Sequence, residues 1–97
     1  MGQSVKSAQF LIDSRMADAA RGDIAACFDL GIVYSTGTDV EIDMIEAHKW
    51  FNLAAIGGDS EAQRYRADIA EDMSAREIST AQKAARAWLQ TTTRAAA

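Results

Sequence analysis

Proline is absent from this 97-residue sequence, which also holds one cysteine and one histidine. Without proline, no residue forces a helix interior to kink or end. The remaining composition is rich in alanine, glutamate, glutamine, lysine and arginine, and it favours helix. Cys27 has no second cysteine with which to form an internal disulfide. One cysteine and one histidine also cannot supply the ligand set of a zinc site.

Positive charge is in the minority, with 10 Lys and Arg against 14 Asp and Glu. A nucleic-acid backbone requires clustered cations, so we expect no nucleic-acid partner. No apolar run approaches the roughly 18 residues that a membrane-spanning helix requires. Residues 1–6 lack the charged-then-apolar pattern of a secretory signal. We therefore expect no membrane association and a cytoplasmic location.

Hydrophobic residues make up 48% of the chain, which predicts one globular domain over residues 1–97. Apolar residues recur at helical spacing in five segments, so the predicted fold class is all-α. The third segment has the widest apolar face and is expected to be the most buried. The predicted helices are residues 4–20, 23–35, 44–56, 60–73 and 74–90, followed by a frayed tail at 91–97.

Capping residues in the sequence indicate where helices begin and end. Asp43 with Glu46, and Ser74 with Glu77, have the spacing of a capping box, in which each residue's side chain accepts from the other's backbone N–H. Gly37 is expected to take a positive φ in the loop before Asp43. These signals place one helix start at residue 43 and another at residue 74.

A short pattern repeats along the chain. Gly22–Asp23 recurs 36 residues later as Gly58–Asp59, and Ala26 recurs at the same interval as Ala62. Glycine suits the left-handed residue after a helix, and aspartate caps the next helix. A period in the thirties that contains two helices and a turn is typical of a helical solenoid.

The segment 23–62 carries small, aromatic and capping residues at fixed offsets: Ala26, Leu30, Gly31, Tyr34, Gly37, Val40, Asp43, Ala47, Trp50, Ala54, Ala55, Gly58 and Ala62. In these positions it resembles one unit of the Sel-one-like repeat family, a relative of the tetratricopeptide repeats. The resemblance implies a short right-handed α-solenoid of antiparallel helix pairs. Its core repeat would span residues 23–58, with partial flanking repeats at 4–22 and 59–90.

Two positions depart from the family pattern. Asp39 stands where the family usually has glycine before the loop valine, and we expect a changed loop backbone there. In the next unit Arg66–Ala67 replaces the expected Leu–Gly. A polar substitution at that point fits a terminal repeat, whose outer face is exposed to water.

No residue set in the sequence predicts catalysis. Cys27 and His48 lie on different predicted helices without a third group to orient them. We interpret Cys27 as a buried thiol and His48 as part of a half-exposed helix surface. Gly57–Gly58 and the Gly37 loop match neither of two glycine-rich phosphate-binding motifs, G-x-x-x-x-G-K-[ST] and G-x-G-x-x-G. The expectation is a non-enzyme with no catalytic, cofactor or metal site.

In related repeats the first helix of each pair lines the concave side, so the resemblance places Phe28, Ile32 and Ser35 there, together with Arg64 and Asp68. If exposed, Phe28 and Ile32 form an apolar anchor with Arg64 as a polar neighbour. The alternative is that the first or the fifth helix covers them. The predicted function is an adaptor that binds a peptide or helix of a partner protein. The alternative function is a structural homo-oligomer assembled through the repeat ends.

Overall fold

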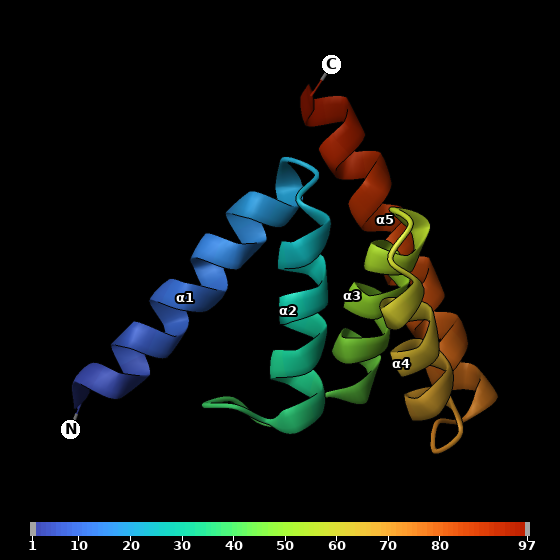
Figure 1. Ribbon diagram of the computed structural model, residues 1–97, viewed down its shortest axis with the longest axis horizontal. Coiled ribbons are helices and arrows are strands. Elements are labelled where there is room, and N and C mark those ends of the chain that lie inside the picture. Colours follow the sequence, from blue (N-terminus) through green and yellow to red (C-terminus); the bar gives the residue numbers. More distant parts are fainter. Residues whose placement is uncertain (1, 97) are drawn as a thin grey trace.

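The computed structural model describes residues 2–96, and it describes side-chain burial for residues 8–93. Within this part of the chain the fold is entirely α-helical, as predicted (Figure 1). Val5, which the periodicity places on the inner face of the first helix, lies outside the residues with described side chains. The helices are α1 (Gly2–Ala20), α2 (Ile24–Thr36), α3 (Met44–Ile56), α4 (Ser60–Ala70) and α5 (Ala75–Ala96).

Helix α3 is the centre of the molecule, since α2, α4 and α5 all pack against it. Helix α1 packs on α2, and its N-terminal half diverges from α2 (Figure 1). The prediction that the third helix is the most buried is confirmed. Its buried residues form a wide face: Ala47, His48, Trp50, Phe51, Leu53, Ala54 and Ala55. Ile56, on the remaining side, is exposed.

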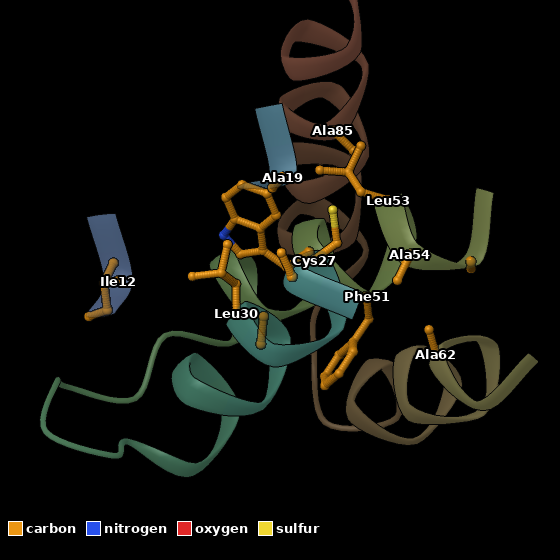
Figure 2. Packing of buried hydrophobic residues seen from close by; sticks show 13 residues of the cluster. Ile12, Ala19, Cys27, Leu30, Phe51, Leu53, Ala54, Ala62 and Ala85 are labelled. Carbon is orange, nitrogen blue, oxygen red and sulfur yellow. The ribbon is translucent and has the colours of Figure 1, made fainter. Parts of the chain in front are cut away.

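The core is built from a few large side chains with small residues between them (Figure 2). Leu30, Trp50 and Phe51 are its largest fully buried side chains. Gly31 lies so close to Phe51 that a Cβ atom at residue 31 would stand 2.5 Å from the ring. Absence of a side chain at Gly31 therefore sets how closely α2 approaches α3.

The repeated Gly–Asp pair forms the same turn twice. Gly22 and Gly58 have φ of 93° and 107°, the left-handed conformation that glycine favours. Asp23 and Asp59 have nearly identical φ, −74° and −78°. Each aspartate accepts a hydrogen bond from the backbone N–H three residues on, at 3.2 and 3.1 Å. The sequence predicts that one helix ends at the glycine and the next begins at the aspartate, and both turns confirm it.

The predicted capping box of α5 is complete. Glu77 Oε1 accepts from the Ser74 backbone N–H at 2.8 Å, and Ser74 Oγ accepts from the Glu77 N–H at 3.1 Å. Residues 71–74 form the turn before it, so α4 ends at Ala70 rather than at Met73. At its far end α5 continues to Ala96, past the end near residue 90 that the sequence predicts.

The predicted capping box of α3 is only half formed. Asp43 accepts from the Glu46 N–H at 3.0 Å, as expected. The Asp43 N–H instead donates to the Tyr34 carbonyl at 3.0 Å. The Glu46 carboxylate accepts from Lys49 Nζ at 2.7 Å. The return bond of this box is therefore absent, because α2 supplies the acceptor that Glu46 would have provided.

The loop between α2 and α3 keeps a glycine-type backbone at Asp39. Its φ is 60°, in the left-handed region where short polar side chains are tolerated best after glycine. A non-glycine residue therefore adopts here a backbone conformation that glycine favours. Val40, next in the chain, packs partly buried against the core.

Candidate interaction surface

The residues predicted to contact a partner are all at least partly accessible. Phe28, Ile32 and Ser35 on α2 are half-buried, whereas Arg64 and Asp68 on α4 are exposed. Helix α2 turns a different set of residues into the core: Ala26, Cys27, Leu30 and Gly31. The helical period thus leaves the predicted residues on the outer side of α2.

Three aromatic rings connect the core to this surface, and we call them the aromatic cluster: Phe28, Phe51 and Tyr65. Phe28 meets Phe51 edge-on at 5.6 Å between ring centroids, and it meets Tyr65 edge-on at 5.4 Å. Phe51 and Tyr65 stack at 5.3 Å. Phe51 is fully buried and Tyr65 is 36% exposed, so the cluster runs outward from the core to solvent.

The cover over Phe28 comes from helices that the sequence did not indicate. Phe28 packs against Phe51 of α3 and Tyr65 of α4, whereas the expected cover was the first or the fifth helix. Phe28 is consequently neither a free anchor nor a core residue. It is an aromatic edge at the junction of α2 and α4.

Tyr65 falls at helical spacing with Ala62 and Ile69, which predicts it on the inner face of α4, whereas the structure leaves it 36% exposed. The 36-residue repeat holds a signal that would have corrected this, since Tyr65 aligns with Asp29, which is exposed on α2. Arg66, next in the chain, aligns with the fully buried Leu30. Its guanidinium turns inward and donates to Asn52 Oδ1 on α3.

The charged side chains beside Tyr65, Arg64 and Asp68, are exposed to solvent. Arg64 pairs with Glu61 at 3.8 Å across open solvent, an arrangement that stabilises little. Asp68 lies one helical turn beyond Arg64. Both signs of charge therefore flank Tyr65 on α4.

Ile32 and Ser35 extend the surface along α2. Ile32 packs partly against the core, and Ser35 Oγ donates to the Ile32 carbonyl at 3.1 Å. They lie one and two turns beyond Phe28. Phe28 joins this side of α2 to α4 through its ring contact with Tyr65.

Cys27 and His48 are both buried. Burial, with a smaller contribution from Asp23, raises the pKa of the Cys27 thiol to about 11. His48 is 3% exposed, so the expectation of a half-exposed helix surface is wrong. Burial, and then the nearby Arg66, lowers the His48 pKa. At neutral pH the thiol is protonated and the imidazole is neutral, which are not the charges of a thiolate–imidazolium pair.

Among the residues that the structure describes, no three His, Cys, Asp or Glu side chains are grouped so that they could hold a metal ion. The described helices also include none with the length and apolar character needed to cross a membrane.

Comparison of the chain with protein-family models, with curated proteins and with solved structures finds no match.

Proposed function

We propose that this chain is a non-catalytic protein-binding module of the Sel-one-like type, in which antiparallel helix pairs form a short right-handed α-solenoid. Two observations support the repeat. The Gly–Asp turns at residues 22–23 and 58–59 share one geometry, and α2 packs on α3 through the small residue Gly31. The resemblance to this family implies a role in binding other proteins.

The aromatic cluster carries the proposal. It gives the junction of α2 and α4 a firm apolar edge, because Phe28 and Tyr65 are both held by the fully buried Phe51. Aromatic side chains anchored in this way supply much of the binding energy of protein interfaces. Arg64 and Asp68 flank that edge with opposite charges.

The partner that fits is a peptide or amphipathic helix with one apolar side chain against Tyr65 and charged neighbours on either side. Helix recognition by a groove uses such apolar anchors at helical spacing. The charges set orientation more than affinity, since they are exposed to solvent.

The test is affinity capture from native cell extract with a charge-swapped surface. The test variant is Arg64→Glu with Asp68→Lys. The matched control is Asp72→Lys with Arg76→Glu, an exposed pair with the same four-residue spacing near the turn from α4 to α5. Both variants keep the net charge. Substitution of Phe28 is unsuitable, because it would disturb Phe51 in the core.

We expect a protein retained by the wild type and by the control, and lost by the Arg64/Asp68 variant. Photo-crosslinking from residue 65 would then join that protein to α4. Equal capture by all three chains would show that the partner, if any, binds elsewhere and would refute this surface.

A further inference from the structure

The N-terminal half of α1 presents two adjacent apolar side chains to solvent. Phe10 is 71% exposed and Leu11 is 59% exposed. Helix α1 packs on α2 through Ile12 and Ala19, which are buried and lie on the side away from Phe10. Leu11 lies between these two sides and lines a hollow with Leu30 and Val33 of α2. Figure 1 shows this half of α1 standing away from α2. We call Phe10 and Leu11 the α1 knob.

An apolar pocket of about 340 Å³ lies where the turn between α1 and α2 faces the C-terminal half of α5. Its inner wall includes Cys27, Leu53 and Trp88. We call it the α5 pocket. Its rim holds three of the molecule's exposed large apolar side chains, each from a different helix: Ile24 at 38%, Ile56 at 59% and Leu89 at 38%.

Single exposed apolar residues are ordinary on protein surfaces, whereas apolar residues gathered on one patch mark an interaction site. Here they gather in two places of opposite shape. One is a projection on a helix and the other is a hollow large enough for an aromatic side chain. The two lie on different parts of the molecule, since Phe10 is about 14 Å along α1 from Ala19 at the pocket.

The charges around the two places are complementary. Asp13 lies one turn beyond Phe10 on α1 and is exposed, with Gln9 as its hydrogen-bond donor at 2.9 Å. Arg21 lines the α5 pocket, where its guanidinium pairs with Asp18 of α1. Arg86 lines the adjoining hollow, which shares Ile56 and Leu89 with the pocket. Asp13 beside the knob is therefore opposite in charge to Arg86 beside the pocket.

We propose that this chain associates head to tail with a second copy of itself, with the α1 knob of one molecule seated in the α5 pocket of the next. The knob and the pocket are different surfaces, so the contact is heterologous and leaves a free knob and a free pocket on every assembly that does not close into a ring. This surface is separate from the aromatic cluster, so the proposal stands or falls independently of the proposed partner site.

The test measures mass by light scattering and sedimentation velocity over a range of protein concentrations, up to about 1 mM, where weak association is still populated. The knob variant is Phe10→Asp with Leu11→Asp, and the pocket variant is Ile56→Asp with Leu89→Asp. The control is Ile42→Asp, which changes another apolar side chain of 60% exposure outside both surfaces. Far-ultraviolet circular dichroism checks that each variant keeps its helices.

We expect the wild type and the Ile42 control to grow in mass with concentration, while the knob variant and the pocket variant each stay monomeric. An equal mixture of the two should form a dimer and stop there, because it retains one intact knob and one intact pocket. Alanine versions of both variants, which favour helix at exposed positions, repeat the test if an aspartate version unfolds.

Three results would overturn the proposal. A wild type that stays monomeric at the highest concentration has no such contact. Variants that associate like the wild type show that another surface is used. A mixture that forms no dimer, although each variant is folded and monomeric, shows that the knob and the pocket do not bind each other.

Discussion

The approach of α2 to α3 depends on one residue without a side chain. Gly31 faces the ring of Phe51, which is fully buried and surrounded by core atoms. Interiors are packed so densely that a buried ring has little room to move aside. The contact between α2 and α3 is therefore sensitive to a single methyl group.

We predict that Gly31→Ala lowers the free energy of unfolding by about 1–2 kcal/mol. The substitution gains up to about 1 kcal/mol of helix propensity, but overpacking costs about 1–3 kcal/mol. Chemical denaturation followed by circular dichroism measures the change. In the double variant Gly31→Ala/Phe51→Leu, the free energy of unfolding should fall by less than the sum of the decreases in the two single variants. Full additivity would mean that residue 31 and the ring do not compete for space.

His48 is the other residue whose surroundings set its behaviour. It is buried on α3, and its Nδ1 atom has no hydrogen-bond partner among the described residues. Its pKa is lowered from 6.5 by burial and by Arg66. The imidazole is therefore held neutral in the folded protein and takes up a proton more readily once the chain unfolds.

This difference predicts a loss of stability on acidification. Because the folded pKa lies below the unfolded one, the contribution of His48 is complete above pH 6.5 and falls as the pH drops towards the folded pKa. One proton gives a slope of at most about 1.4 kcal/mol per pH unit. Denaturation between pH 7.5 and about pH 5 measures the slope. The same titration of His48→Gln should be flatter, and an equal slope would assign the effect to other groups.

At the scale of the element, the helices begin where local capping residues stand. Asp23, Asp59 and Ser74 each satisfy backbone N–H groups at a helix start. These bonds form within three residues of chain, so they depend little on the rest of the fold.

Since the turns at Asp23 and Asp59 share one geometry, the two caps should contribute similarly to the free energy of unfolding. We predict that Asp23→Ala and Asp59→Ala each lower the free energy of unfolding by about 1 kcal/mol. Asp72→Ala is the control, because Asp72 is exposed and its side chain caps no helix. Thermal and urea unfolding of the three variants makes the comparison. A cap variant no less stable than the control would contradict the prediction.

At the scale of the whole molecule, α5 is joined to the centre through a pair of tryptophans. Trp88 meets the fully buried Trp50 of α3 edge-on at 4.8 Å between ring centroids. Lys49 Nζ lies 4.4 Å from the centroid of the Trp50 ring. Ala81 and Ala85, also buried, bring the helix backbones together below this pair. Trp88 therefore adds an aromatic contact to the packing of α5 on α3.

We predict that Trp88→Ala lowers the free energy of unfolding by about 3 kcal/mol, the lower end for truncating an aromatic side chain in a core, because Trp88 is only partly buried. The variant leaves Trp50 as the one fluorophore of its kind. Its emission should shift to the red as water reaches the ring. Trp88→Phe keeps an aromatic contact, so its free energy of unfolding should fall by less than that of Trp88→Ala. An unchanged Trp50 spectrum in Trp88→Ala would show that another side chain closes over Trp50.

The sequence by itself determined the helical class, the helix starts and both Gly–Asp turns. Each depends on interactions between residues a few positions apart, such as Asp23 with the N–H of Ala26 and Ser74 with Glu77. The apolar width of α3 also predicted its central position, because so wide an apolar face needs neighbours on more than one side.

Only the tertiary structure decided which neighbour covers which side chain. It buried His48, which the sequence left half-exposed, and it brought Tyr65 to the surface beside Phe28. It also gave Glu46 a partner in Lys49 because α2 already satisfied the Asp43 N–H. Such outcomes depend on the direction from which a distant helix arrives, and the spacing of residues along one helix does not encode that direction.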